Sequence, residues 1–205
     1  PIWKGLPDTL ETETLEIPNY SALAAQNQGA LRFNTENTAH YITDYQGVLL
    51  EQILEGITDL DSTSKLQVVQ ERRLLAEAGS ISFADLVPVI EKLTEETSYL
   101  VVSGVKAVLN GLKLFVDEGS ECEKAYHKLV VKLSKFNFDR LGFEVKEGES
   151  DEDELVRQIV VGSLIAADDQ VASKEASRIF AAHQEDLEKL PAAIRLHVLI
   201  NQIKH

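Results

Sequence analysis

The chain has 205 residues, of which 44% are hydrophobic and 26% are charged, so it can bury a core without disulfide bonds. Its formal net charge of −14 repels polyanions and anionic lipid surfaces. We therefore expect neither nucleic-acid nor membrane partners. The longest weakly charged stretches are interrupted by Lys106, Lys113 or Arg157, and they fall short of the roughly 20 apolar residues that a membrane span needs.

The cysteine and methionine content bears on where the protein works and on whether the chain is whole. Cys122 is the single cysteine, which excludes an internal disulfide and agrees with a reducing, cytoplasmic location. The N-terminus shows no basic region followed by an apolar one, so we expect no secretory signal. The chain contains no methionine, and we expect it to be a piece of a longer polypeptide.

Residues 1–35 have the pattern of a β domain. Residues 12–17, TETLEI, alternate polar and apolar side chains, and residues 29–33, GALRF, form a short run that Asn34 ends. Both patterns predict strands. Because two or three strands are too few to be stable alone, we expect them to be the remnant of a larger sheet.

The apolar period becomes helical from about residue 37. Spacings of three and four place Val102, Val105, Leu109, Leu112 and Val116 along one helix face. A second apolar seam of the same kind consists of Cys122, Tyr126, Leu129, Leu133 and Phe136. The pattern predicts eight helices, near residues 37–56, 62–78, 83–95, 97–116, 120–138, 151–167, 173–188 and 191–204.

Three serine-acid pairs mark helix starts. They have the capping-box spacing, in which two side chains satisfy free amides of the first turn, and are Ser82 with Asp85, Ser120 with Glu123, and Ser150 with Asp153. Pro191 suits a first turn, where its missing donor costs little. Pro88 either kinks a helix that begins at Ser82 or marks a later start.

The predicted fold class is mainly α. Short loops between the predicted helices favour antiparallel neighbours. Eight amphipathic helices in series favour a stacked αα-superhelix, of the HEAT or armadillo kind, over a closed bundle. A closed bundle stays open as the alternative, because no sequence repeat is visible.

Six carboxylates occur within eight positions before the apolar run at 155–166. They are Glu147, Glu149, Asp151, Glu152, Asp153 and Glu154. A calcium loop that starts at Asp151 would need glycine at its sixth position and glutamate at its twelfth, but Val156 and Gly162 stand there. We interpret the cluster as a solvated helix start, where carboxylates face free amides and the positive end of the helix dipole.

The sequence lacks the motifs of common active sites. The five histidines, His40, His127, His183, His197 and His205, form no HExxH zinc pair. Cys122 lies on the apolar seam, where we expect a buried thiol with a raised pKa and not a nucleophile. Asp168 and Asp169 are typical of a turn, and the GxSxG and phosphate-binding glycine motifs are missing. We therefore expect no catalytic, cofactor-binding or metal-ligating residue in this chain.

Several short motifs, in order along the chain, resemble one family. Residues 141–164 resemble the pattern "LGW...K.GE....LLR..VLG.L" in the C-terminal helical domain of zinc aminopeptidases of the aminopeptidase N family, with Phe143 in place of tryptophan. Four further matches are NQGALRF from Asn27, Glu95-Glu96 with Tyr99, Glu175-Ala176 with Arg178 and Phe180, and Ala193-Ile194-Arg195 with Val198.

The resemblance implies that this chain is the non-catalytic part of a longer enzyme. Residues 1–35 would end a β-sandwich domain, and residues 36–205 would begin a truncated superhelical C-terminal domain. The catalytic zinc and its ligands would belong to a preceding catalytic domain, and the helices would wall the chamber that admits peptides. No catalytic residue is carried over, and Arg157 and Arg195, which match family positions, are expected to form structural salt bridges. The alternative is an independent helical scaffold that binds a protein partner on its concave face.

Overall fold

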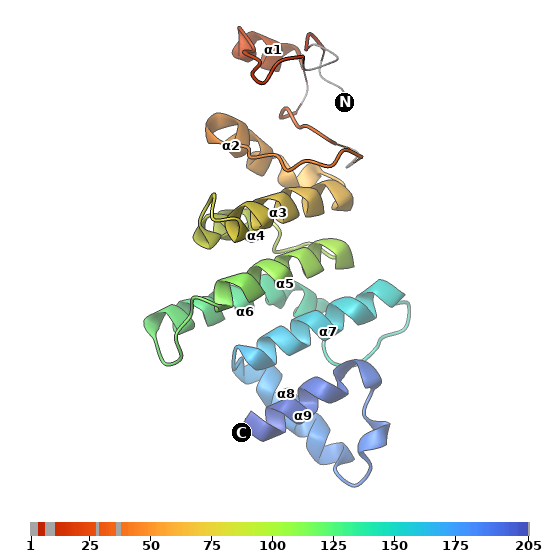
Figure 1. Ribbon diagram of the computed structural model, residues 1–205. Coiled ribbons are helices and arrows are strands. Elements are labelled where there is room, and N and C mark those ends of the chain that lie inside the picture. The colour runs from red at the N-terminus through yellow and green to blue at the C-terminus, as the bar shows by residue number, and fades with distance from the viewer. Residues whose placement is uncertain (1–3, 7–10, 28, 36–37, 205) are drawn as a thin grey trace.

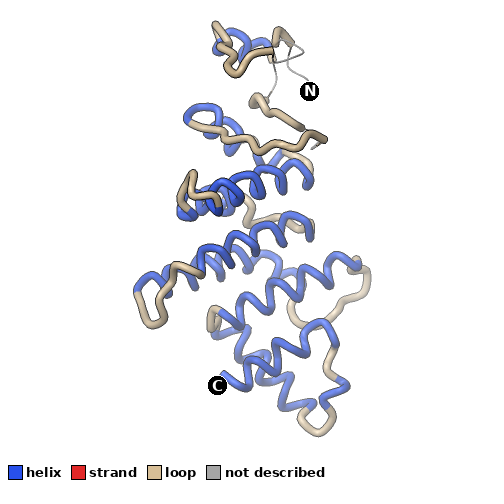
Figure 2. Tube along the Cα trace, viewed as in Figure 1, coloured by secondary structure: helices blue, strands red, loops and turns tan. Residues whose placement is uncertain are grey.

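The computed structural model describes residues 4–6, 11–27, 29–35 and 38–204. Within these residues every regular element is a helix, loops connect the helices, and there is no strand (Figure 2). The α-helices are α1 (Tyr20–Gln26), α2 (Gly47–Glu55), α3 (Ser62–Glu77), α4 (Val87–Glu91), α5 (Tyr99–Lys113), α6 (Glu121–Leu141), α7 (Asp151–Ala166), α8 (Gln170–His183) and α9 (Ala192–Lys204). Short 3₁₀ helices are η1 (Ile57–Asp59), η2 (Phe83–Leu86) and η3 (Leu187–Lys189).

The helices stack in series. Helix α3 packs on α5, α5 on α7, and α7 on α9, so every second helix belongs to one continuous row. The intervening elements cover this row, because η2 packs on α3 and α5, α6 on α7, and α8 on α7 and α9. The N-terminal helices and α9 lie at opposite ends of the stack (Figure 1). This arrangement confirms the predicted mainly α superhelix, since a closed bundle would bring the two ends together.

The apolar core follows the stack in two main clusters. The first joins α2 through α6 around Ile57, Ile90 and Val108, and the second joins α7, α8 and α9 around Val161, Ala172 and Val198. All six side chains are fully buried. The half-buried Val131 of α6 packs against both clusters. Each helix therefore buries its apolar face against its immediate neighbours, as the period-3.6 pattern predicts.

The three predicted capping serines, Ser82, Ser120 and Ser150, are the N-caps of η2, α6 and α7. Ser82 with Asp85 and Ser150 with Asp153 each form both hydrogen bonds of a capping box. The pair of Ser120 and Glu123 forms only one of the two capping-box hydrogen bonds, in which Ser120 Oγ accepts from the Glu123 N–H at 3.1 Å. The Glu123 carboxylate accepts from the Gly119 N–H and not from the Ser120 N–H.

Proline also has a local effect near the first of these starts, at Ser82. The helix begun at Ser82 is first a 3₁₀ turn, η2, and α4 begins at Val87 with proline in its first turn. Pro88 therefore marks a later α-helical start and does not kink a continuous helix.

The helix predicted for residues 37–56 is wrong over its first part. Residue 37 lies outside the described residues, residues 38–46 are not helical, and α2 begins only at Gly47. Tertiary contacts hold the preceding segment: the Tyr45 ring is buried, its hydroxyl accepts from the Phe33 N–H at 2.8 Å, and Arg72 donates to the Tyr45 carbonyl at 3.0 Å. These contacts replace the hydrogen bonds that a helix would have made.

The two strands predicted at 12–17 and 29–33 are also absent from the described residues. Helix α1 lies between these segments, and the Tyr20 hydroxyl donates to Gln52 of α2 at 3.0 Å. A strand needs a neighbouring strand for its backbone hydrogen bonds, and the described part of the chain supplies none. The domain boundary between residues 35 and 36 stays a prediction.

Candidate functional site

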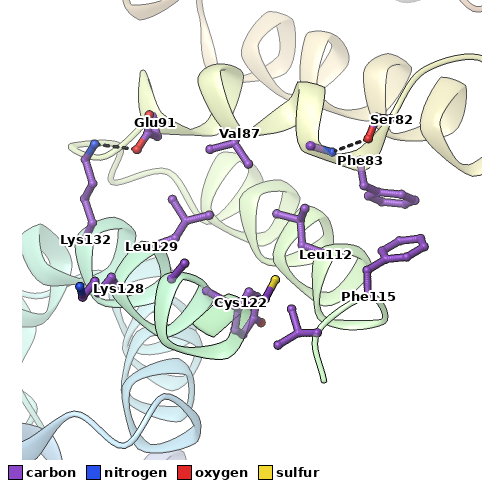
Figure 3. Close-up of a pocket in the computed structure, with 14 residues that line it drawn as sticks. Ser82, Phe83, Val87, Glu91, Leu112, Phe115, Cys122, Lys128, Leu129 and Lys132 are labelled. Atoms are coloured by element: carbon purple, nitrogen blue, oxygen red, sulfur yellow. Dashed lines mark hydrogen bonds and ion pairs between the residues drawn. The ribbon is translucent and has the colours of Figure 1, made fainter. Parts of the chain in front are cut away.

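An apolar groove opens between η2–α4, the end of α5 and the start of α6 (Figure 3). Its volume is about 700 Å³, which is within the range of pockets that bind small molecules or side chains of a partner. The walls carry Phe83 and Val87 on one side, Leu112 on α5 with Phe115 just beyond the end of this helix, and Leu129 on α6. Phe115 is 68% exposed and the adjacent Leu114 is 82% exposed, so apolar surface extends beyond the groove itself.

The aromatic end of the groove depends on a glycine. The Ala84 N–H donates to Ser82 Oγ at 3.1 Å, which fixes the turn that carries Phe83. A Cβ atom on Gly111 would lie 2.2 Å from Cε1 of Phe83, so only glycine allows this ring to lie against α5. The rings of Phe83 and Phe115 then meet with centroids 5.6 Å apart.

Polar groups lie at the other end. The Lys132 ammonium pairs with the Glu91 carboxylate at 2.7 Å and joins α6 to α4 (Figure 3). Lys128, one turn earlier on α6, is exposed and forms no ion pair with a described residue. Burial raises the pKa of the Tyr126 hydroxyl, which keeps this group neutral at physiological pH.

Cys122 lines the groove and is exposed, so the prediction that it is buried on the apolar seam is wrong. The seam of α6 is buried only in its middle: Tyr126 and Leu129 are half-buried, Leu133 is buried, and Phe136 is again exposed. The first turn of α6 borders the open groove, where Cys122 is exposed. The expectation failed because periodicity identifies a face of a helix and not the length over which a neighbour covers it.

The described residues of the groove do not place a hydrogen-bonded base beside its thiol, Cys122. A nucleophile needs a base within hydrogen-bond reach and a third group that orients the base. Cys122 has no hydrogen bond to a histidine or carboxylate of the described chain. The groove is suited to recognising apolar groups, with charge at one edge.

The acidic cluster is a helix start with two structural ion pairs. Asp151 to Glu154 occupy the first turn of α7, as predicted. The Ser150 backbone N–H and the Arg140 guanidinium hold the pKa of the Asp153 carboxyl below its usual value. This pairing ties the end of α6 to the start of α7.

Glu149 forms the second ion pair of the cluster, with Arg157. The Arg157 side chain is fully buried, and its Nη2 donates to Glu149 Oε2. Partial burial opposes ionisation of Glu149, but the hydrogen bonds from Arg157 and from the Lys146 backbone prevail and lower its pKa. The structural salt bridge predicted for Arg157 is confirmed.

The salt bridge predicted for Arg195 is not found among the described residues. Its guanidinium donates to the Leu190 carbonyl at 2.8 Å and to the Glu188 carbonyl at 2.8 Å, and it pairs with no carboxylate of the described residues. Arg195 therefore ties the η3 turn to α9 through backbone acceptors. The sequence shows only that an arginine stands at position 195. It does not show whether the guanidinium donates to backbone carbonyls or to a carboxylate.

The residues that could hold a metal are dispersed. In the described ranges, no three histidine, cysteine, aspartate or glutamate side chains lie close enough together to hold an ion. His183 Nδ1 lies 2.9 Å from the Ile179 carbonyl within its own helix, and His197 lies against α7. The donor set of the described chain therefore does not fit zinc. No described helix has the length and apolar character to span a membrane.

Sequence reasoning missed two concave sites. One is the groove of Figure 3, and the other is a pocket around Lys106 and His197 between α5, α7 and α9. The available signals were two glycines inside helical patterns, Gly111 and Gly162, because a glycine within a helix can indicate that a side chain of a neighbouring element packs closely there.

The row of stacked helices places the chain among the αα-superhelical domains. Residues 31–205 match the family model described as the ERAP1-like C-terminal domain, and the chain belongs to this family. The resemblance to the C-terminal helical region of the aminopeptidase N family is thereby confirmed.

Known relatives agree with this assignment. The chain is 55% identical to an aminopeptidase N of Lactococcus lactis subsp. lactis, over 98% of the chain and 24% of the relative. It is 37% identical to aminopeptidase N of Lactobacillus helveticus, over 97% of the chain and 24% of the relative. A rice protein, aminopeptidase M1-B, is 26% identical over 69% of the chain and 17% of the relative. The chain thus spans about a quarter of the length of its bacterial relatives.

Proposed function

We propose that this chain is the non-catalytic C-terminal domain of a zinc aminopeptidase that removes N-terminal residues from peptides. The observation that carries the proposal is the family match over residues 31–205, combined with relatives named aminopeptidase N at up to 55% identity. In this proposal zinc and the acid/base groups lie in a catalytic domain of the same polypeptide, since the donor set of the described chain does not fit the metal.

The helical stack suits the role of a wall over the substrate chamber. Helices α3, α5, α7 and α9 form one continuous row, and the second layer supports it from behind. A row supported in this way is a stiff surface, and a stiff wall admits flexible peptides while it excludes folded proteins. The partners are then the catalytic domain and the peptide substrates of the whole enzyme. The exposed thiol of Cys122 agrees with a reducing, cytoplasmic location.

The apolar groove supplies a contact surface for the catalytic domain in this proposal. Leu114 and Phe115 leave large apolar areas exposed beside it, and such contiguous surface is typical of an interface. The occupant we infer is part of the same polypeptide, because about three quarters of the bacterial relatives lies outside the matched region.

An activity and metal assay tests the assignment. The purified chain is incubated with alanyl and lysyl chromogenic amides, and zinc is measured after chelator treatment and dialysis, beside a full-length aminopeptidase N as positive control. We expect no hydrolysis above buffer and no stoichiometric zinc. Hydrolysis that follows the chain through purification and disappears with chelator would contradict the proposal.

The gene distinguishes the proposal from an independent scaffold that binds a protein partner. An HExxH motif upstream in the same reading frame supports a domain of an aminopeptidase, since this motif places two zinc ligands on one helix turn. A start codon near Pro1 with no such motif supports the scaffold.

A further inference from the structure

A second pocket lies on the row formed by α5, α7 and α9. It has a volume of about 390 Å³ and shares no lining residue with the groove of Figure 3. Lys106 of α5 and His197 of α9 line it, together with residues of α7 that include Gln158 and Gly162. Two basic groups from helices distant in sequence therefore meet in one cavity.

Glycine at position 162 is what allows the imidazole to lie in this pocket. A Cβ atom on Gly162 would stand 2.4 Å from Cε1 of His197 and 2.9 Å from both ring nitrogens. A hydrogen bond to the Gln158 backbone further fixes the ring. The position of His197 is thus built into the packing of α7 on α9, and the imidazole is not a loose surface group.

The two basic groups have no acidic counterpart. Lys106 is half-buried and forms no ion pair with a described residue. Burial lowers its pKa, and the charge of Lys113 adds to the effect. Burial also lowers the pKa of His197, with a further contribution from Lys106, while the Gln158 hydrogen bond opposes the shift. The two groups disfavour each other's charge, as like charges in a shared cavity do.

The acidic residues of the surrounding helices lie elsewhere. Helices α5 and α9 contain no aspartate or glutamate, and those of α7 all lie in its first turn. The last of these, Glu154, precedes Gln158 by one turn and does not line the pocket. Asp168, just beyond α7, pairs with Lys204. A chain of net charge −14 thus keeps one pocket free of carboxylates and lines it with a lysine and a histidine.

We propose that this pocket is an oxyanion site, in which Lys106 and His197 bind a carboxylate or phosphate group. A lysine ammonium is a compact charge that binds such groups well. An imidazolium donates a second charge-assisted hydrogen bond from a fixed ring. An anion placed between the two cations replaces their mutual repulsion with two attractions. This proposal does not depend on the proposed function, since the pocket is formed entirely by residues of this chain.

Proton linkage gives the site a pH dependence of known sign. His197 is neutral at and above neutral pH and gains its charge as the pH falls below the ordinary histidine value of about 6.5. The bound anion favours the imidazolium, so anion binding raises the pKa of His197, and by reciprocity a lower pH tightens anion binding.

An NMR titration of the full chain tests this directly. The Cε1–H signal of His197 is followed from pH 5 to pH 8 in chain labelled at histidine, at constant ionic strength in sodium chloride. The probes are N-acetylalanine, inorganic phosphate and the uncharged N-acetylalaninamide. We expect either anion to raise the pKa of His197 and to leave the other histidines unchanged, while the amide has no effect. A response to one anion alone identifies which group the site takes.

Variants assign the effect to this pocket. Lys106→Gln should weaken anion binding about tenfold through loss of a charge-assisted contact, and should raise the pKa of His197 in the anion-free chain. Gly162→Ala should displace the ring and abolish the response. Lys174→Gln is the matched control, because Lys174 is exposed on α8, outside the pocket. Absence of a pKa change with both anions, or equal weakening in Lys174→Gln and Lys106→Gln, would overturn the proposal.

Discussion

Removing the Glu149 carboxylate should destabilise the chain more than any other single change in the acidic cluster. Arg157 is fully buried, and its Nη2 donates a hydrogen bond to Glu149, whose side chain is 11% exposed. Nε and Nη1 of Arg157 already lack a partner among the described residues. Glu149→Ala would leave this guanidinium charged, buried and without its counter-ion.

The magnitude follows from the burial of the pair. Removing one member of a buried ion pair costs about 3 kcal/mol, because the remaining charge keeps its desolvation cost and loses its attraction. For a domain of this length, that loss lowers the melting temperature by roughly 6 to 12 °C. Replacing both members by apolar groups costs much less, so Glu149→Ala with Arg157→Met should recover most of the stability.

Urea unfolding followed by circular dichroism measures these free energies. Glu147→Ala is the control, since Glu147 belongs to the same loop and is exposed. The reasoning is refuted if Glu149→Ala and Glu147→Ala cost the same, or if the double variant is less stable than Glu149→Ala alone.

The same pair gives a pH dependence. The pKa of Glu149 is lowered in the folded chain, so the pair stabilises it fully above the ordinary glutamate value of about 4.3 and loses this contribution as the pH falls through the folded value. The difference in unfolding free energy between the unmodified chain and Glu149→Ala should therefore shrink below about pH 4.3. A difference that stays constant to pH 3 would contradict the assignment.

Three further predictions concern helix ends and the groove. Ser150→Ala removes the Oγ that accepts from the Asp153 N–H and should lower the free energy of unfolding by about 1 kcal/mol, measured in urea; an unchanged value would exclude a role for the cap. Gly111→Ala places a Cβ against the Phe83 ring and should also cost about 1 kcal/mol, and this cost should vanish in a Phe83→Ala background if the contact is its cause. Cys122 should react fully with Ellman's reagent in the folded chain and more slowly in the complete aminopeptidase, where the catalytic domain covers the groove; equal rates would place the interface elsewhere.

Much of the helical part could be predicted, because its signals are local. Ser82 and Ser150 define helix starts through hydrogen bonds that reach only three residues. Apolar spacing of three and four likewise identifies the buried faces of α5 and of the middle of α6. Each of these patterns concerns residues within one or two turns, so a single sequence is sufficient to find it.

The features that were missed depend on contacts between distant residues. Residues 38–46 have a helical pattern, yet Arg72 and Phe33 hold Tyr45 in a non-helical segment. The pocket around Lys106 and His197 joins residues 91 positions apart in the numbering, and no local pattern specifies that α5, α7 and α9 adjoin. The exposure of Cys122 likewise depends on where the neighbouring helices end.

The two clusters of core residues give the stack a natural point of local opening. The clusters meet where α6 packs on α7: Val131 of α6 packs against both, and Ala167, just after α7, belongs to the first. Because cooperative units follow the contiguous cores, α8 and α9 should exchange their amide hydrogens in one kinetic group and α3 to α5 in another. Bending of the superhelix would then concentrate where the two halves meet, at α6 and α7, and the wall would be stiff within each half.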